Sequence, residues 1–228
     1  MSSGYAIDIQ APVVVIDLNG HRLGGGNAGP GTQAIGIHAL NQKDITIKNG
    51  TIRGFQYGVL LQDNSNGYAS TGGHVLDGLR VDSNTYVGLQ VQGSGNIVRN
   101  NQVVATGGSP VNAADAIGIE VNGPGARVLN NDVTEVAAQT GGTALGISLG
   151  NASNSVLAGN RIGSLTAPSG ATYGIYLYSS SDSIVRDNSL SGMQYGIIFQ
   201  GTGKYMNNMT QGVGMPYTGG TAAGATNY

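Results

Sequence analysis

The segment Ala116-Ile117-Gly118-Ile119-Glu120-Val121-Asn122 decides the fold, because its central pattern of apolar residue, glycine and apolar residue returns along the chain. The same pattern stands at Ile35-Gly36-Ile37, Tyr57-Gly58-Val59, Val87-Gly88-Leu89, Leu145-Gly146-Ile147, Tyr173-Gly174-Ile175 and Tyr195-Gly196-Ile197. Successive glycines are 22, 30, 30, 28, 28 and 22 residues apart. Ala6-Ile7-Asp8-Ile9 matches Ala34-Ile35-Gly36-Ile37, which gives eight units in all. A recurring unit of this size predicts a solenoid.

A second repeated pattern lies about half a unit after each glycine. An apolar residue is followed by a turn residue and then by another apolar residue, as in Val128, Asn131 and Val133. The turn position holds Asn101, Asn131, Asn160, Asn188 and Asn208 in later units and His21 in the first. We expect the asparagines to stack inside the coil and to pass amide hydrogen bonds along the column. His21 is expected to be a stacked polar cap of the same column.

The repeated unit is too small to bury its own apolar side chains. Its apolar blocks are short, alternate with polar residues and are interrupted by Gly, Asn and Ser, as in β-strands. Stacking one unit on the next would bury a continuous column of side chains. We therefore predict an all-β fold, a right-handed parallel β-helix of about eight coils over residues 1–210. Residues 211–228 form a Gly-rich C-terminal tail, which we expect to cap the last coil through Met215 and Tyr217.

Composition excludes several classes of function. The net charge is −2, and the 10 Lys and Arg residues are spread singly along the chain, which argues against a nucleic-acid partner. No apolar run approaches the roughly 20 residues that a membrane-spanning helix needs, so we expect no membrane partner. The chain has no cysteine, which excludes a disulfide framework and a thiolate metal site.

Two segments carry a resemblance to a known family. Val14-Val15-Ile16-Asp17-Leu18-Asn19-Gly20-His21 and the stretch Ile45-Thr46-Ile47-Lys48-Asn49-Gly50-Thr51-Ile52-Arg53-Gly54, with the later glycine and asparagine patterns, resemble repeats of the pectate-lyase-like superfamily. That superfamily holds right-handed parallel β-helices that include polysaccharide lyases, glycoside hydrolases, phage tailspikes and adhesins. The resemblance implies that a glycan would bind along the outer face of the first strand of each coil.

The resemblance also bears on where the protein acts. We expect a secreted or cell-surface protein. Met1-Ser2-Ser3-Gly4 leads directly into a strand without a signal peptide. The alternatives are a cytosolic protein or a signal that this chain lacks.

Alternation along the first strands predicts which side chains face outward. The first outward row is Gln10, His38, Leu60, Gln90, Glu120, Ser148, Tyr176 and Ile198, and the second is Pro12, Leu40, Gln62, Gln92, Asn122, Gly150, Tyr178 and Gln200. Amides bond to sugar hydroxyls and tyrosine rings stack on sugar faces. The substrate-binding residues are therefore expected to be Gln90, Gln92, Asn122, Tyr176 and Tyr178. The tyrosines that precede the repeated glycines, Tyr57, Tyr173 and Tyr195, are expected to be structural.

Candidate catalytic residues are few, so the sequence leaves enzymatic activity open. If the protein is an enzyme, the resemblance implies a polysaccharide lyase or a glycoside hydrolase. Hydrolysis needs two carboxyl groups roughly 5 to 9.5 Å apart. Glu120 is the candidate on the outward face, and Asp115 can join it only if its loop folds back. His38 is the third candidate.

No cofactor and no metal site are expected from the sequence. The acidic residues are scattered and do not form the calcium cluster of a pectate-type lyase. Calcium bound between Asp63, Asn64, Asn66 and Asp82 is the alternative to a solvated loop.

We interpret the chain as a polysaccharide-binding or glycan-binding β-helix. The alternative is a non-catalytic structural, adhesion or self-assembling scaffold. Strand edges at the end of a β-helix are unpaired unless something covers them. No helix precedes the first coil, so we expect either that an N-terminal cap has been removed or that a second molecule stacks there, by end-to-end self-association through the uncapped N-terminal coil.

Overall fold

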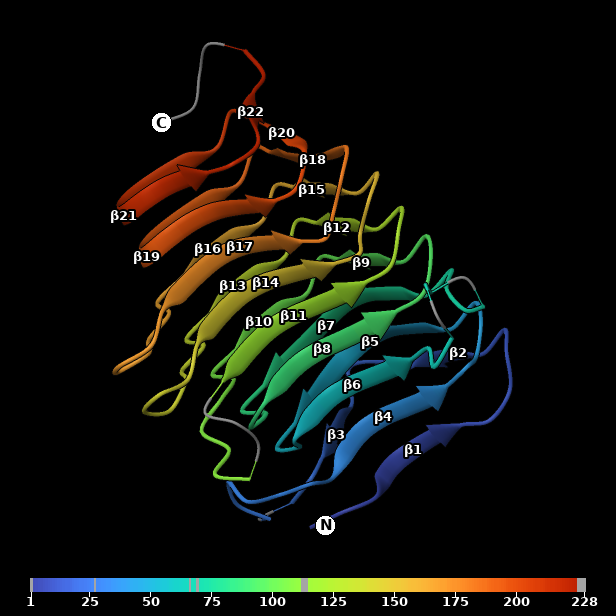
Figure 1. Cartoon of the computed structure of the whole chain (residues 1–228). Helices are drawn as coiled ribbons and strands as arrows, with labels where there is room; N and C mark the ends of the chain where they lie inside the picture. Colours follow the sequence, from blue (N-terminus) through green and yellow to red (C-terminus); the bar gives the residue numbers. More distant parts are fainter. Residues whose placement is uncertain (1, 27, 66, 69, 112–114, 225–228) are drawn as a thin grey trace.

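Each strand of the chain pairs in parallel with its counterpart in the next coil, and the coils stack into one parallel β-helix (Figure 1). The computed structural model describes residues 2–26, 28–65, 67–68, 70–111 and 115–224. The strand bounds below refer to these residues.

Three columns of strands run along the stack. The first strands of the coils are β1 (Tyr5–Ile9), β4 (Ile35–Leu40), β6 (Tyr57–Gln62), β8 (Val87–Gln92), β11 (Ala116–Asn122), β14 (Ala144–Gly150) and β17 (Thr172–Tyr178). The second strands are β2 (Val15–Asp17), β9 (Ile97–Arg99), β12 (Arg127–Leu129), β15 (Val156–Ala158), β18 (Ser183–Arg186), β20 (Gly203–Met206) and β22 (Thr221–Ala222). The third strands are β3 (Arg22–Gly24), β10 (Gln102–Val104), β13 (Asp132–Thr134) and β16 (Arg161–Gly163). Four long strands each contribute to two columns: β5 (Thr46–Arg53), β7 (Val75–Asp82), β19 (Ser189–Gln200) and β21 (Met209–Thr218).

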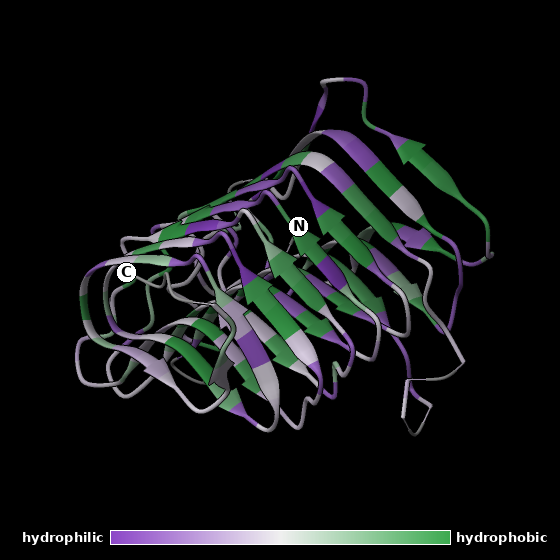
Figure 2. Ribbon diagram, turned by 90° about the horizontal axis from the view of Figure 1, so that it is seen from above, coloured by the Kyte–Doolittle hydropathy of each residue, from purple (hydrophilic) through white to green (hydrophobic). Residues whose placement is uncertain are grey.

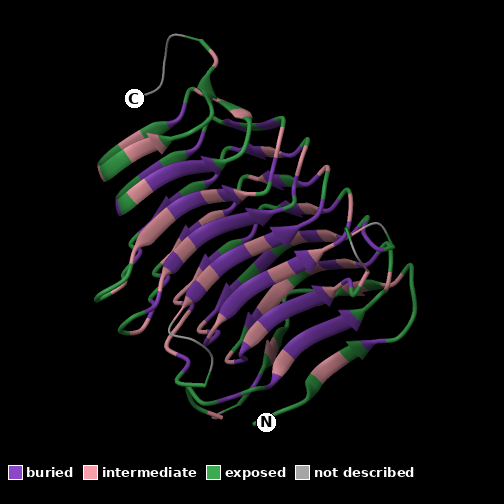
Figure 3. Ribbon diagram, viewed as in Figure 1, coloured by how far each residue is buried: buried purple, intermediate pink, exposed green. Residues whose placement is uncertain are grey.

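The core is a set of columns in which each apolar side chain packs on its counterpart in the next coil. Ile37, Val59, Leu89, Ile119, Ile147, Ile175 and Ile197 form one such column, and all are fully buried. Figure 2 shows the result as apolar stripes that cross neighbouring strands, and Figure 3 shows the same strands buried in the middle of the stack. The inward positions predicted for the first strands are confirmed at these residues.

The repeated glycine marks a place where two successive positions face the core. A Cβ atom on Gly118 would lie 2.5 Å from Val133 Cγ1 and 2.6 Å from the carbonyl oxygen of Gly146, so its missing side chain points inward. Ile119, the next residue, is also fully buried. The residue before the glycine therefore faces outward. Tyr57, Tyr173 and Tyr195 occupy this position and face outward, and their expected structural role stays a prediction.

A ladder of asparagine amides runs inside the stack at the turn between the second and third strands. Asn131 Nδ2 donates to Asn160 Oδ1 at 3.0 Å and to the Val98 carbonyl at 2.9 Å. Its Oδ1 accepts from Asn101 Nδ2 at 3.0 Å. Asn101, Asn160, Asn188 and Asn208 repeat this arrangement, and all are buried. The left-handed backbone residue of the turn is the preceding one, such as Asn130 with φ 54°.

The first coil differs from the predicted register. Tyr5 pairs with Ile35 and Asp8 with His38, so the match of Ala6 with Ala34 was wrong by two residues. Asp8, and not Gln10, therefore stands in the row of His38. β1 has Ala6 where the later first strands have the repeated glycine, so the pattern did not mark the register of the first coil. His21 is exposed and is not a buried cap.

The two ends of the stack also differ from each other. In the first coil Ile7, Ile16 and Leu18 are only partly buried, and Val13 is 73% exposed. Self-association through this end stays a prediction. At the other end β21 continues the parallel stack, so the coils extend past residue 210. Tyr217 stacks on Tyr205 over the last coil with ring centroids 4.5 Å apart, whereas Met215 faces outward and is 47% exposed.

We predict that Asn131→Ala destabilises the fold by about 3 kcal/mol, because it leaves buried donors and acceptors of the ladder without partners. Urea unfolding followed by circular dichroism measures the loss. Gln194→Ala, an exposed amide on β19, is the matched control and should change the free energy of unfolding by less than about 0.5 kcal/mol. Equal effects of the two substitutions would contradict a stabilising role for the ladder.

Candidate active site

The parallel register brings Glu120 into a row of outward side chains. Glu120 on β11 is aligned with Gln90 on β8 and with Ser148 on β14, and Ser148 is aligned with Tyr176 on β17. Neighbouring members of a row lie about one strand spacing, roughly 4.8 Å, apart. Three of the predicted site residues, Gln90, Glu120 and Tyr176, therefore lie on one face within four coils.

A chain of hydrogen bonds joins Tyr178, Asn122 and Glu120. Tyr178 Oη donates to Asn122 Oδ1 at 2.8 Å, and Asn122 Nδ2 donates to Glu120 Oε1 at 3.2 Å. Tyr178 and Asn122 are two coils apart, with Gly150 between them. A Cβ atom on Gly150 would overlap the Tyr178 ring, its hydroxyl and Asn122 Oδ1. Glycine at this position therefore lets the Tyr178 side chain lie across β14 to reach Asn122.

Tyrosine rings extend this site toward the C-terminal coils. The ring centroids of Tyr178 and Tyr176 are 5.9 Å apart, those of Tyr176 and Tyr173 are 5.3 Å apart, and those of Tyr173 and Tyr195 are 4.9 Å apart. Tyr173 and Tyr195 are stacked with an interplanar angle of 12°. Together these four rings form a continuous aromatic surface, which we call the tyrosine face.

Glu120 lies among further tyrosines on its other side. Burial raises the pKa of Glu120, and the hydrogen bond from Asn122 opposes this shift. Burial also raises the pKa of Tyr57 and of Tyr178 to about 12, and the charge of Glu120 contributes to both shifts. The pKa of Tyr86 is raised by burial and by the charge of Glu120 as well. The Glu120 carboxyl group is therefore a partly desolvated acid whose charge raises the pKa of three phenol groups.

A loop after β6 stands beside the tyrosine face. Gln92 Oε1 accepts the backbone N–H of Asp63 at 2.9 Å, so this predicted sugar-binding amide holds the start of the loop. Tyr68 in the loop influences the pKa of Tyr178, and its Cβ lies 3.1 Å from where a Cβ of Gly123 would stand. Gln92 thus supports the wall of the site with its carbonyl oxygen.

The predicted outward rows are not uniformly open to solvent. Leu60, Ser148 and Ile198 are buried, and so is Asn122, although all four stand in outward positions. Alternation predicts the direction of a side chain, but it does not predict which neighbouring side chains cover it. The tyrosines and Glu120 are partly buried, and the exposed members of the two rows lie toward the ends of the stack, at Gln10, Pro12, Leu40 and Gln200.

Asp115 and His38 make their hydrogen bonds outside the chain that joins Tyr178, Asn122 and Glu120. Asp115 Oδ1 accepts the backbone N–H of Thr143 at 2.7 Å, so the carboxylate ties its loop to the next coil. Its charge contributes to the raised pKa of Tyr86, whereas burial is the only contribution that raises the pKa of Glu120. The geometry gives Asp115 a loop-anchoring contact and does not show it paired with Glu120.

His38 is buried, contrary to the expectation of an exposed strand position. Its Nδ1 lies 2.7 Å from Asp8 Oδ1 and its Nε2 3.2 Å from Gln62 Oε1. The Tyr5 ring stacks on the imidazole with centroids 4.1 Å apart. Three strand steps, about 14 Å, separate this row position from Glu120. His38 and Asp8 therefore form a separate polar pair near the first coil.

Asp63 and Asp82, two of the residues proposed for calcium, already have other partners, and the calcium alternative stays a prediction. Asp63 accepts hydrogen bonds from Ser65 N at 2.7 Å and from Thr71 Oγ1 at 2.7 Å within its own loop. Asp82 stands at the end of β7 and forms ion pairs with Arg53 and Arg80. Asn66 lies outside the described residues. Within the described ranges, no group of three or more His, Asp or Glu side chains could hold a metal ion.

Sequence reasoning missed several members of the site, namely Tyr57, Tyr68, Tyr86, Tyr173 and Tyr195. A signal was present for Tyr57, Tyr173 and Tyr195, since each precedes a repeated glycine. Simple alternation predicts that the residue before the glycine faces inward. It faces outward because the glycine itself faces the core. Tyr68 comes from an insertion that carries no repeat.

Comparisons with known proteins agree with this architecture. A family model described as "Right handed beta helix region" matches residues 35–212. No curated protein matches the sequence.

Solved structures show the same fold at low sequence identity. The Dettilon tailspike protein is similar with a TM-score of 0.60 and 12% identity, over 97% of this chain and 48% of that one. PfbA, a surface adhesin of Streptococcus pneumoniae, gives a TM-score of 0.55 and 13% identity over 90% and 59% of the two chains. The Siphovirus 9NA tailspike receptor binding domain gives a TM-score of 0.54 and 12% identity, over 99% of this chain and 46% of that one. The chain thus spans about half the length of these structures.

The raised pKa of Glu120 predicts how stability depends on pH. The folded chain holds this proton more tightly than the unfolded chain, so stability falls as the pH rises from the ordinary value of 4.5 through the folded pKa. Glu120→Gln removes this contribution and keeps an oxygen acceptor for Asn122. We expect the substitution to stabilise the protein more at about pH 8 than at about pH 4 in urea unfolding. Glu135→Gln, at an exposed position, is the control. If it changed the pH dependence of stability as much as Glu120→Gln does, the effect could not be assigned to burial of Glu120.

Gly150→Ala tests the path of Tyr178 across β14. The added methyl group should displace the Tyr178 ring, break its hydrogen bond to Asn122 and move its pKa from about 12 back toward 10. Titration of ¹³Cζ-labelled tyrosine by NMR measures the shift. Gly31→Ala, where the nearest atom would be Val111 Cγ2 at 4.0 Å, is the control and should leave the Tyr178 resonance unchanged.

Proposed function

The chain belongs to the right-handed β-helix family, and we propose that it binds a carbohydrate polymer along the tyrosine face and the neighbouring Glu120. One observation carries this proposal. Four outward tyrosine rings follow one another on the same face as a partly buried carboxyl group that is hydrogen-bonded to Asn122.

The rings of the tyrosine face are suited to sugars. A phenol side chain offers a flat apolar surface together with a polar group, so it can contact both the C–H face and the hydroxyl groups of a sugar. Ring centroids 4.9 to 5.9 Å apart give a surface that continues over more than one ring. An extended ligand matches this shape better than a compact one.

Polar groups next to the rings would orient the ligand. Gln90 adjoins Glu120 in the same row, and the Glu120 carboxyl group accepts from Asn122 through one oxygen. Its second oxygen and the Gln90 amide can accept and donate hydrogen bonds to sugar hydroxyls. Binding sites commonly combine an apolar lining with a few such polar groups.

A role outside the cell accords with this proposal. The similar structures include two tailspike proteins and a surface adhesin, and this chain matches only part of each. We propose the same kind of location, secreted or at a surface, for this chain. Among the described residues, no helix is long and apolar enough to span a membrane.

Cleavage of the bound glycan is a second candidate function, favoured by the raised pKa of Glu120. A carboxyl group that retains its proton can act as the general acid on a glycosidic oxygen. Hydrolysis also needs a second carboxylate, and the Asp115 carboxylate is engaged by Thr143 N. Binding is accordingly the function that the geometry supports best.

The test is binding of the purified chain to neutral and uronic-acid polysaccharides, measured by calorimetry and by affinity electrophoresis. Tyr176→Ala should weaken binding at least tenfold, about 1.4 kcal/mol, because it interrupts the run of rings. Tyr5→Ala removes an exposed tyrosine from the same strand column outside the tyrosine face and is the matched control. Equal weakening by both variants would contradict the site.

The same samples distinguish binding from cleavage and from a scaffold. New reducing ends, or absorbance from unsaturated products, that disappear in Glu120→Gln would make the protein an enzyme. Binding without product would leave it a binding module. No binding to any polysaccharide would overturn the proposal in favour of a structural or self-assembling scaffold.

A further inference from the structure

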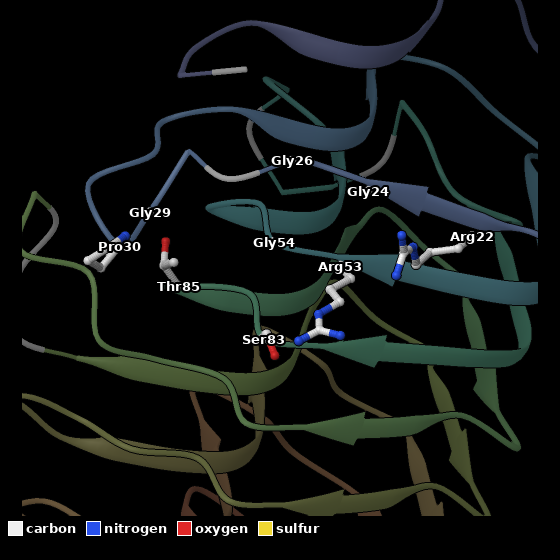
Figure 4. A pocket seen from close by; sticks show the side chains of 9 residues that line it. All are labelled: Arg22, Gly24, Gly26, Gly29, Pro30, Arg53, Gly54, Ser83 and Thr85. Carbon is white, nitrogen blue, oxygen red and sulfur yellow. The ribbon is translucent and has the colours of Figure 1, made fainter.

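A pocket of about 570 Å³ lies away from the tyrosine face, at the bend between the third strands and the next first strands. Its lining includes Arg22 of β3, Arg53 at the end of β5, and Thr85, which precedes β8. The loop that contains Gly29 and Pro30 closes one side of it. In the view of Figure 4, the Arg53 side chain stands between Arg22 and Thr85. The volume is in the range of pockets that hold small ligands.

The charges that line this pocket are positive. Arg22 and Arg53 are the charged residues of the lining, which contains no carboxylate. Asp82 stands behind them and is almost buried. Its two oxygens lie 3.0 Å from Arg53 Nε and 3.1 Å from Arg80 Nε. Asp82 thus pairs with two arginines, Arg53 and Arg80, and Arg22 adds a further positive charge to the lining, although the whole chain has a net charge of −2.

The contacts of Arg53 leave the outer part of its guanidinium group accessible. Asp82 is engaged with Nε, and the Arg53 side chain is 52% exposed. Arg22 forms no ion pair with a described residue and is exposed. Both guanidinium groups can therefore offer paired N–H donors to one ligand oxyanion, with Asp82 Oδ1 3.0 Å from Arg53 Nε.

A second observation points to a missing partner in the same place. Thr85 is 8% exposed, and its hydroxyl oxygen is buried without a hydrogen-bond partner among the described residues. Buried hydroxyl groups are nearly always satisfied, so an unsatisfied one in the wall of a pocket indicates that something else supplies the bond. A hydroxyl-bearing ligand would do so.

We propose that this pocket binds an acidic sugar, with its oxyanion on Arg22 and Arg53 and a hydroxyl group toward Thr85. The oxyanion is a carboxylate or a sulfate ester, since both present paired oxygens to arginine. This site is independent of the tyrosine face, so it stands if the proposed function fails. The pocket lies on another part of the coil. It would recognise the charge of its ligand, whereas the tyrosine face would stack on a sugar ring.

The test is calorimetric titration with glucuronate, glucose 6-sulfate and glucose. We expect one or both acidic sugars to bind, with an affinity that falls as salt increases, and glucose to bind at least tenfold more weakly. Comparison of the two acidic sugars identifies the oxyanion. Binding of glucose as tight as that of both acids, or binding of none of the three, would overturn the proposal.

Three variants tie the binding to this pocket. Arg22→Ala should weaken the acidic sugar at least tenfold, and Arg127→Ala, which removes an exposed arginine from the second-strand face, should not. Thr85→Val should weaken binding without destabilising the free protein, because it removes an unsatisfied buried hydroxyl. Equal effects of Arg22→Ala and Arg127→Ala would overturn the assignment.

Gly24→Leu tests the pocket by filling it. A Cβ atom at Gly24 would meet only Arg22 Nε, at 3.7 Å, so the backbone tolerates the substitution. We expect it to abolish binding of the acidic sugar while the melting temperature and the binding of polysaccharide to the tyrosine face are unchanged. Retained affinity for the acidic sugar in a folded Gly24→Leu protein would contradict this location.

Discussion

Coil-to-coil register is the constraint on which the rest of the structure depends. Parallel pairing places each residue about 4.8 Å from its counterpart in the next coil, so the molecule is a set of columns. Asn131 can bond to Asn101 below and Asn160 above only because all three stand at the same position of their coils. The same rule places Gln90 beside Glu120. Core and site are therefore built by repetition of single positions.

Glycine shapes both the core and the outer face of this regular stack. At Gly118 the missing side chain lets the strand point two successive residues inward, which turns the residue before it outward. Tyr173 and Tyr195 reach the outer face in this way. At Gly150 the absent side chain is on the outside and makes room for the Tyr178 ring. One residue type thus supports the core in one column and opens the site in another.

Much of the fold was readable from the sequence because the repeats report the columns directly. The inward positions of Ile119 and Val121 and the place of Asn131 followed from period and alternation. The register of the first coil could not be predicted in this way. Ala6 stands where later coils have glycine, so no residue marked the two-residue shift in register. Burial of Asn122 and the role of Tyr68 depend on side chains and loops of other coils, which a period cannot predict.

The two surfaces proposed as binding sites differ in charge, and this separates their ligands. Glu120 is partly desolvated beside the tyrosine face, so an anionic sugar brought against its ionised form would add a second poorly solvated negative charge. Sugars without charge, which meet the rings and donate hydroxyl groups to the carboxylate, avoid this cost. Arg22 and Arg53 offer the opposite environment on another part of the coil. A glycan that carries both neutral and acidic units would accordingly place its neutral stretch on the tyrosines and its acidic unit in the arginine pocket.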